Sequence, residues 1–218
     1  MEKITLKIKR KVEGKSWIEN YFVDIDTGKS TLLEALQKVR EKVDPSLAIR
    51  YGCRFKNCGL CGVTVNEVPR MACMTKVKNN MNVGPLNNMP ILQDLVVDRS
   101  FITETIKEKK LIPLPINTST LSVMNEKFEA VSKCTDCQAC ISGSTVYKHD
   151  KREEVVAPLF FVKLAQLQFH PQNTQDYSEK ANELGVKKYK DSPPIPCPYG
   201  IPIKKLAIDS FLENDLKV

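Results

Sequence analysis

The chain has 218 residues, of which 42% are hydrophobic and 27% are charged, and its formal net charge is +7. These proportions are ordinary for a soluble globular protein. The most apolar stretch, residues 155–169, is interrupted by proline, lysine and glutamine, so we expect no membrane-spanning segment. The lysines are spread along the chain without interleaved aromatic residues, so we expect no nucleic-acid partner.

The first half of the sequence predicts a mixed sheet with one helix packed across it, the β-grasp arrangement. Apolar and basic residues alternate from Ile4 to Val12, as is typical of a half-buried strand. Ser30 or Thr31 is placed to cap a helix that runs to about Val43 and ends at Asp44-Pro45. The expected strands are Ile4–Val12, Trp17–Ile25, Val63–Val68 and Met81–Leu86.

Beyond residue 94 the pattern favours helices. A helix is predicted over Asp94–Lys110, and the proline- and threonine-rich segment 111–122 is predicted to be a linker. We therefore place the domain boundary here, with one domain in residues 1–110 and the other in residues 111–218. Further helices are expected over Val123–Ser132, Gln138–Lys148, Pro158–His170, Thr174–Leu184 and Pro202–Leu216. The apolar residues of the third of these, such as Phe160 and Phe161, indicate either core or a docking face.

All eight cysteines fall into two sets of four, one in each half. The first set has the spacing C-x4-C-x2-C-x11-C, which is the spacing of a plant-type [2Fe–2S] site. Glycines interleave this loop, and Arg54 and Lys56 stand beside its ligands, where their charges would favour thiolate over thiol. We expect the ligands to be Cys53, Cys58, Cys61 and Cys73.

The second set is a compact C-x2-C-x2-C run followed much later by a Cys-Pro pair. In the bacterial ferredoxin run C-x2-C-x2-C-x3-C-P, the fourth cysteine serves a second cluster. Here that position is Ser144, and Cys197 supplies a remote fourth ligand instead. We expect one [4Fe–4S] cluster held by Cys134, Cys137, Cys140 and Cys197. The fold class predicted is α+β, with a plant-type ferredoxin domain followed by an all-α, bacterial-ferredoxin-like domain.

Two alternatives to iron–sulfur clusters stay open. The first is a set of disulfides, which the absence of a signal-peptide-like N-terminus and the close spacing of the cysteines disfavour. The second is structural zinc, which usually takes well-separated C-x2-C pairs. A zinc-binding structural protein is therefore retained as a less favoured interpretation.

The remaining residues predict no catalytic site. The sequence has two histidines, His149 and His170, which we interpret as surface or helix-end residues, and it lacks phosphate-loop, dinucleotide-binding and nucleophile-elbow motifs. Any catalysis is therefore expected on another polypeptide, and this chain is expected to be a non-catalytic electron-transfer protein.

Several segments resemble the iron–sulfur subunit of succinate dehydrogenase and fumarate reductase, over nearly the full length of the chain. The matching segments are Cys53–Cys61, Pro69–Cys73, Val83–Asp98 and Cys197–Ile208. The resemblance implies an FAD-containing catalytic subunit as partner, with the [2Fe–2S] cluster nearest the flavin and the [4Fe–4S] cluster beyond it. It also implies a cytoplasmic location, or a peripheral one at the inner face of the cell membrane through partner subunits.

The resemblance fails at one place. The family's third cluster, a [3Fe–4S] cluster beside the quinone site, takes three further cysteines, and two of those positions align with Ser144 and Pro193 here. No cysteine occurs between residues 141 and 196, and the tryptophan expected shortly after the second cysteine run is missing. We therefore expect one of two outcomes: electrons leave from the [4Fe–4S] cluster to a different protein or carrier, or a quinone binds in an unfamiliar way. The corresponding partner would be a further electron-acceptor protein or a membrane-associated subunit.

Other functions compatible with the same residues stay open. The partner could be another FAD-dependent dehydrogenase, acting on a hydroxy acid, an amino acid or glycerol phosphate. A free ferredoxin without an obligate partner is a further alternative.

Overall fold

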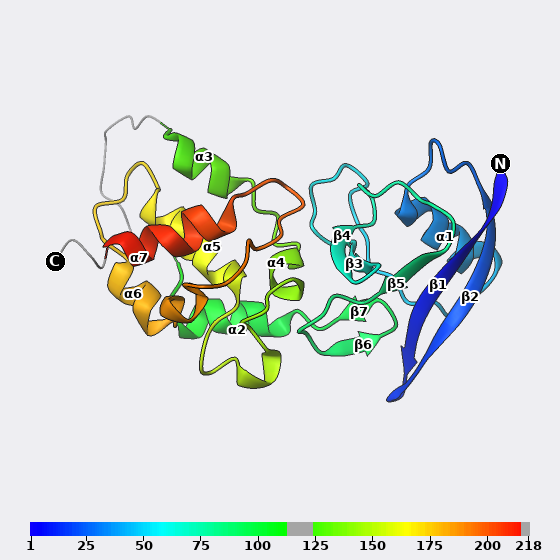
Figure 1. The fold of residues 1–218 in the computed structure, drawn as a ribbon, viewed down its shortest axis with the longest axis horizontal. Helices are drawn as coiled ribbons and strands as arrows, with labels where there is room; N and C mark the ends of the chain where they lie inside the picture. The colour runs from blue at the N-terminus through cyan, green and yellow to red at the C-terminus, as the bar shows by residue number, and fades with distance from the viewer. Residues whose placement is uncertain (113–123, 215–218) are drawn as a thin grey trace. The chain divides into compact units, whose positions relative to one another are not determined.

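The computed structural model describes residues 1–112 and 124–214 (Figure 1). The chain divides into two compact units. The first comprises Met1–Asp98 and Thr135–Gly143, and the second comprises Arg99–Cys134 and Ser144–Val218. The second unit is thus interrupted by a short segment that belongs to the first.

A five-stranded mixed sheet forms the first unit, with strand order β2-β1-β5-β3-β4. The long hairpin of β1 and β2 is antiparallel in full register and turns at Glu13 and Gly14, which both have positive φ. β5 runs parallel to β1 and antiparallel to β3. The strands are β1 (Glu2–Val12), β2 (Lys15–Ile25), β3 (Gly62–Val65), β4 (Val68–Met71) and β5 (Met81–Gly84).

The single long helix of this unit, α1 (Leu32–Lys42), starts at the predicted position. Thr31 is its N-cap, and a complete capping box links the Thr31 side chain with Glu34. Its apolar face, including Leu32, Leu36 and Val39, is buried together with the inward residues of β1. A mixed sheet covered by one helix is the arrangement that the alternation and the capping signal predicted.

Three details of this unit differ from the sequence-based expectation. The predicted strand Val63–Val68 is instead the two strands of a hairpin, because Asn66 and Glu67 take left-handed backbone conformations and reverse the chain. The predicted helix from Asp94 begins only at Ser100, since β6 (Ile91–Gln93) and β7 (Val96–Val97) form a small ladder there. The predicted helix Gln138–Lys148 is only the short α4 (Ala139–Ser142).

The second unit consists of helices in its described part. They are α2 (Ser100–Glu108), α3 (Glu126–Ser132), η1 (His149–Lys151), α5 (Pro158–Gln168), α6 (Ser178–Glu183), η2 (Val186–Tyr189), η3 (Lys204–Asp209) and α7 (Ser210–Asn214). α5 is the core of this unit, since Phe160 and Phe161 are both buried. For the apolar residues of this segment the sequence allowed either a core position or a docking face, and the structure places them in the core.

Several helices of this unit are shorter than predicted. α6 begins at Ser178 rather than Thr174, and the predicted C-terminal helix starts as a π-helical segment, η3, before α7. The predicted linker and the first residue of the predicted helix Val123–Ser132 lie largely outside the described residues. The α+β fold class is confirmed, with a mixed sheet followed by helices. Within the described residues, no helix is both long and apolar enough to cross a bilayer.

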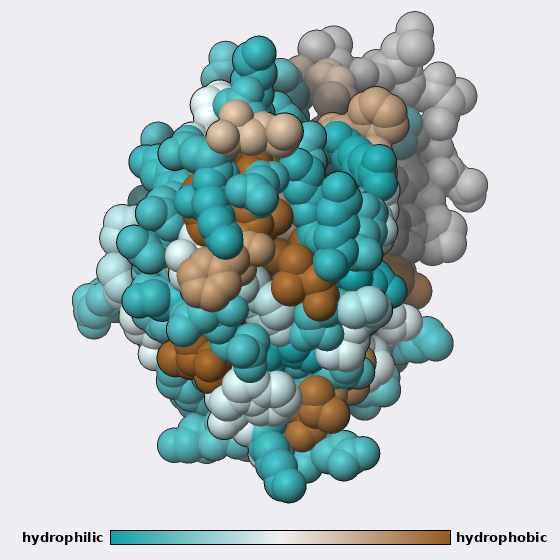
Figure 2. Space-filling view, turned by 90° about the vertical axis from the view of Figure 1, so that its right-hand side faces the viewer, coloured by the Kyte–Doolittle hydropathy of each residue, from teal (hydrophilic) through white to brown (hydrophobic). Residues whose placement is uncertain are grey.

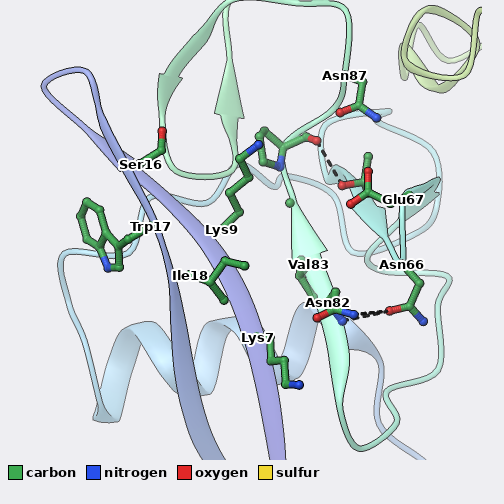
Figure 3. A pocket seen from close by; sticks show the side chains of 13 residues that line it. Lys7, Lys9, Ser16, Trp17, Ile18, Asn66, Glu67, Asn82, Val83 and Asn87 are labelled. Atoms are coloured by element: carbon green, nitrogen blue, oxygen red, sulfur yellow. Dashed lines mark hydrogen bonds between the residues drawn. The ribbon is translucent and has the colours of Figure 1, made fainter.

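The outer face of the sheet, opposite α1, is mostly hydrophilic. Figure 2 views the molecule from the β1–β2 side and shows apolar side chains among hydrophilic ones. A hollow of about 390 Å³ on this face is lined by Lys7 and Lys9 of β1, Ile18 of β2 and Asn82 of β5, among others (Figure 3). No cysteine lines it, so it is separate from the candidate metal centres.

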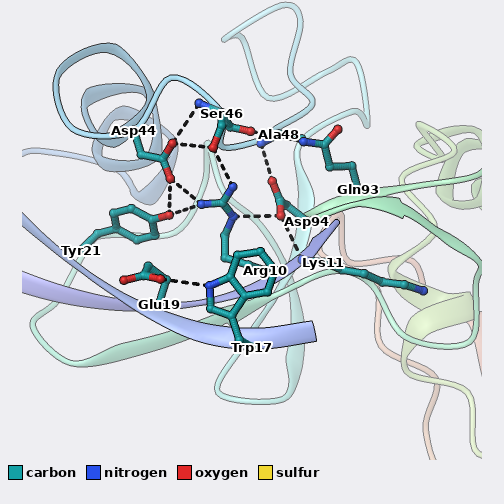
Figure 4. A network of polar contacts seen from close by, with 10 residues as sticks. All are labelled: Arg10, Lys11, Trp17, Glu19, Tyr21, Asp44, Ser46, Ala48, Gln93 and Asp94. Atoms are coloured by element: carbon teal, nitrogen blue, oxygen red, sulfur yellow. Dashed lines mark hydrogen bonds and ion pairs between the residues drawn. The ribbon is translucent and has the colours of Figure 1, made fainter. Parts of the chain in front are cut away.

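A buried ionic network joins distant segments of the first unit (Figure 4). The Asp94 side chain is fully buried and accepts hydrogen bonds from Arg10 Nε at 2.9 Å, Lys11 N at 3.0 Å and Ala48 N at 2.9 Å. Arg10 also donates to Asp44 and Tyr21. Buried charges are stable only when paired and hydrogen-bonded, and each charge here has several partners.

The network shifts the pKa values of Asp44 and Tyr21, and the shift of Asp44 favours its charged form beside Arg10. Hydrogen bonds from Ser46 and Tyr21 hold the pKa of Asp44 well below its usual range, although burial acts in the opposite direction. Burial, and then the hydrogen bond to Asp44, raise the pKa of Tyr21 to about 12. Asp44 is therefore an anion in the folded protein at neutral pH.

We predict that Asp94→Asn lowers the free energy of unfolding by about 3–5 kcal/mol, because Arg10 then loses a buried counter-charge. Urea denaturation followed by the fluorescence of Trp17, which lies 5.6 Å from the Arg10 guanidinium, measures the change. The control is Asp24→Asn, at an exposed residue of β2, for which we expect a change below about 0.5 kcal/mol. Equal losses in the two variants would contradict the role given to Asp94.

A second prediction concerns pH. Because folding lowers the pKa of Asp44, its contribution is complete above the ordinary aspartate pKa of about 3.9 and is lost as the pH falls below it. The difference in unfolding free energy between the wild type and Asp44→Asn should be constant above about pH 5 and shrink toward about pH 3. The same urea titrations measure it, and a difference independent of pH would refute the prediction.

Candidate metal centres

The first four cysteines lie on one loop and at the end of one hairpin. Cys61 directly precedes β3, and Cys73 follows β4 by two residues. The register of this hairpin pairs Gly62 with Met71, and beyond it Ala72 N donates to Cys61 O at 2.9 Å. Cys73 N then lies 3.4 Å from Cys61 Sγ. The hairpin thereby brings the last cysteine of the set back to the loop.

Backbone amides of the loop surround the sulfur of Cys53. Its Sγ accepts hydrogen bonds from Phe55 N at 3.3 Å, Asn57 N at 3.4 Å and Cys58 N at 3.2 Å. Cys53 N in turn donates to Cys58 Sγ at 3.5 Å. Such convergent amides form a concave site that favours an anionic sulfur.

This loop conformation depends on residues with positive φ. Arg54 has φ 56° and Lys56 has φ 61°. These are left-handed backbone conformations, which residues other than glycine rarely adopt. They alternate with the residues whose amides point at Cys53. Their side chains are exposed, and the Arg54 guanidinium lies 6.0 Å from the Tyr51 ring. The backbone of Arg54 and Lys56 therefore shapes the site.

The pKa shifts of the thiols follow this geometry. Hydrogen bonds from the amides of Asn57 and Phe55 lower the pKa of Cys53 to about 7. The sequence suggested that the charges of Arg54 and Lys56 do this, but the amides are the main cause. Burial raises the pKa of Cys73 to about 12, together with its hydrogen bond to Cys61 and the nearby charges of Cys61, Cys53 and Cys58. The structure thus brings the four cysteines of the first set together.

The second set is divided between the two units. Cys137 and Cys140 are buried in the first unit, whereas Cys134 and Cys197 are half-buried in the second. Asp136 and Gln138, which separate the cysteines of the run, have φ 55° and 62°, and Gln138 Nε2 donates to Asp136 O at 2.7 Å. Left-handed residues other than glycine thus occur next to cysteines in both cysteine loops.

The chemistry of the two sets fits iron–sulfur clusters. None of the eight cysteines is in a disulfide. In the described part of the chain, no group of three or more His, Cys, Asp or Glu side chains is arranged as ligands of a single metal ion. Thr135 Oγ1, next to Cys134, is buried without a hydrogen-bond partner. The sulfur atoms of a cluster would give such a hydroxyl an acceptor.

The positions aligned with the third cluster have other roles. Ser144 is buried, and its Oγ accepts hydrogen bonds from Tyr147 N at 3.0 Å and Val146 N at 3.3 Å. Pro193 is exposed. Tyr147 is 1% exposed, and burial raises its pKa to about 12. Ser144 thus stabilises a turn that leads into a buried tyrosine.

The two histidines pack against aromatic rings. His149 lies edge-on to Phe101 at 4.9 Å and its Nδ1 is 3.2 Å from the Tyr147 hydroxyl. His170 lies edge-on to Phe128 at 5.1 Å, just beyond the end of α5. Packing and turn contacts account for the surroundings of both rings.

The N-terminal part of the chain is similar to a known family of domains. Residues 5–104 match the family model described as a 2Fe-2S iron-sulfur cluster binding domain. This range includes all four cysteines of the first set. This part of the chain therefore resembles [2Fe–2S]-binding domains.

About three fifths of the chain is similar in sequence to iron–sulfur subunits of succinate dehydrogenase and fumarate reductase. The fumarate reductase iron-sulfur subunit of Haemophilus influenzae is 31% identical over 159 residues, which cover 63% of this chain and 62% of the relative. The succinate dehydrogenase iron-sulfur subunit of Paracoccus denitrificans is 30% identical over 146 residues, 60% of this chain and 54% of the relative. The chain spans 34%, 62% and 40% of the length of three curated relatives that it matches.

A solved structure shares the fold. A chain of the Sdh1 complex of Mycobacterium smegmatis in the apo form superposes with a TM-score of 0.86 and 24% sequence identity, covering 99% of this chain and 96% of that chain. The likeness shows that the mixed sheet and the following helices are a fold used in such a complex.

The loop geometry generates a prediction at Lys56. Lys56→Gly should retain the wild-type amount of first cluster, because glycine adopts the left-handed conformation freely. Lys56→Val should reduce it, because β-branched residues resist that conformation. Both variants remove the same charge, so each controls for the other. The reduced [2Fe–2S] signal in electron paramagnetic resonance (EPR), counted per chain, measures the difference, and equal signals would contradict the backbone argument.

Proposed function

We propose that the chain is the electron-transfer subunit of a multi-subunit flavoprotein oxidoreductase of the succinate dehydrogenase and fumarate reductase kind. The observation on which this depends is the gathering of the first four cysteines around a loop of inward-pointing amides. The sequence resemblance and the shared fold support the same conclusion. The chain itself is proposed to be non-catalytic.

Each cysteine set is assigned one cluster in this proposal. Cys53, Cys58, Cys61 and Cys73 would hold [2Fe–2S], and Cys134, Cys137, Cys140 and Cys197 would hold [4Fe–4S]. The clusters would supply one-electron oxidation and reduction, which no protein side chain of this site provides. The chain contributes thiolates, amide hydrogen bonds to sulfur, and burial, which together set the reduction potentials.

The proposed partner on the electron-input side is an FAD-containing catalytic subunit. Its substrate is proposed to be the succinate/fumarate pair, because relatives that this chain matches are named for fumarate reductase and succinate dehydrogenase. A different FAD-dependent dehydrogenase, acting on a hydroxy acid, an amino acid or glycerol phosphate, could use the same two-cluster arrangement. A peripheral position at the inner face of the membrane through partner subunits belongs to the same proposal.

On the output side, we propose an acceptor other than a quinone bound in the family's usual way. Ser144 stands where the resemblance places a ligand of the third cluster, and its hydroxyl accepts two backbone hydrogen bonds within its own turn. Electrons would then leave from the second cluster to another protein or carrier.

Metal analysis with two ligand variants tests this function. We expect about six iron and six sulfide ions per anaerobically purified chain, two of each from [2Fe–2S] and four from [4Fe–4S]. Cys73→Ala should lose about two irons and the reduced [2Fe–2S] EPR signal, because its set then lacks a ligand. Cys197→Ala should retain that signal and lose the [4Fe–4S] one. Each variant is the control for the other.

Two results would contradict the proposal. Zinc in place of iron would replace it with a structural metal protein. A native [3Fe–4S] signal in intact protein would restore a third cluster and with it the ordinary quinone-linked role.

A further inference from the structure

Two glycines of the first cysteine loop lie directly against the second cysteine run. Gly59 has φ +66°, and a Cβ atom there would lie 2.1 Å from Thr135 O and 3.1 Å from Cys137 N. A Cβ atom at Gly62 would lie 3.1 Å from Cys137 O. No side chain fits at Gly59 without moving the backbone of the other loop. The two ligand loops therefore touch through their backbones.

The second run is anchored in this position within the first unit. Asn87 N donates to Ser142 Oγ at 2.8 Å, and Asn88 Nδ2 donates to Ile141 O at 3.1 Å. α4 also packs beside β4. Cys137 and Cys140 are buried. These contacts hold segment 135–143 as part of the [2Fe–2S]-binding unit.

We propose that Gly59 and Gly62 are positioning residues for electron transfer between the two clusters, and that Cys137 is the ligand through which the second cluster exchanges electrons with the first. This inference depends on the proposed function. Tunnelling rates fall steeply with distance and are higher through bonded and closely packed atoms than through gaps. Two short routes meet at Cys137 here, from Cys58 through Gly59 and from Cys61 through Gly62.

The electron count of the step is simple. One electron, supplied originally by the reduced flavin of the partner, leaves the first cluster, which is oxidised by one electron. The second cluster is reduced by one electron, and no bond forms or breaks. The glycines change only the separation and packing of the two ligand loops.

The test is Gly59→Ala in the full-length protein. Wild-type protein reduced fully with dithionite should show magnetic interaction between the two reduced clusters in EPR. In Gly59→Ala the added methyl group must displace the Thr135 backbone, so we expect the interaction to be lost while both clusters remain. Electron redistribution between the clusters after partial reduction should also slow.

Gly14→Ala is the matched control. Gly14 has φ +82°, as left-handed as Gly59, but nothing lies within 4 Å of a Cβ atom there. It therefore carries the same kind of backbone cost without the loop contact. We expect Gly14→Ala to retain the wild-type interaction.

Gly62→Ala covers the case in which Gly59→Ala does not fold or loses a cluster. Gly62 needs no left-handed conformation, and its other near neighbour is Leu86 Cδ1 at 2.9 Å, a side-chain end that can move. We expect a weaker magnetic interaction in this variant. Wild-type interaction in a fully loaded Gly59→Ala or Gly62→Ala, or no interaction in the wild type, would overturn the inference and leave the two-cluster function intact. Absence of both clusters from the wild type would overturn the function itself.

Discussion

The buried carboxylate of Asp94 is the constraint on which the first unit depends. It accepts three hydrogen bonds, from the Arg10 side chain, the Lys11 amide and the Ala48 amide, and so joins β1 to the segment that follows α1. That segment leads directly into the first cysteine loop. Leu95 N donates to Ala48 O and the Arg50 guanidinium donates to Val97 O, so the stretch after Asp94 is also joined to the segment that follows α1. The charged network of Arg10 and Asp94 therefore restrains the segment around Ala48, which leads to Cys53.

Buried ion pairs of this kind are not strong sources of net stability, because desolvation of both charges offsets their attraction. Their value lies in the cost of any alternative arrangement. A shifted register of β1 would bury the guanidinium of Arg10 or the carboxylate of Asp94 without its partner, at a cost of several kcal/mol. The network thus selects one register of the sheet, and with it one geometry of the loop that the sheet supports.

Much of the fold was predictable because local signals and tertiary packing agree. Strand alternation in β1 and the capping box at Thr31 each indicate one structure, and the protein adopts it. The failures occur where residues other than glycine take left-handed conformations, as at Asn66 and Glu67 between β3 and β4 and at Asp94 between β6 and β7. Asparagine and aspartate tolerate this conformation, but their presence alone does not require it. The sequence pattern therefore predicts one strand where a hairpin forms, and a helix that begins before Ser100.

In the candidate sites, too, some features were predictable from the sequence and others were not. Cysteine spacing predicts one ligand set for the first four thiols, and in the structure the hairpin of β3 and β4 places Cys73 beside Cys61. The roles of the neighbouring residues were not predictable. The charges beside Cys53 suggested side-chain electrostatics, whereas backbone amides are the main cause of its lowered pKa. Gly59 is one of the glycines that interleave the first loop, and its close approach to Thr135 is visible only in the assembled fold.

Backbone amides also donate to the side chain of Ser144, as they do to the sulfur of Cys53. At Cys53, amides two, four and five residues later donate to the sulfur, and at Ser144 amides two and three residues later donate to the hydroxyl. A turn that presents amides to a side-chain acceptor thus exists at both places. An oxygen is a poorer ligand than a thiolate for the iron of a cluster. The hydroxyl also satisfies these amides without any metal, so this turn is stable without a third cluster. A turn that needs no cluster at Ser144 supports the proposed electron route that ends at the second cluster.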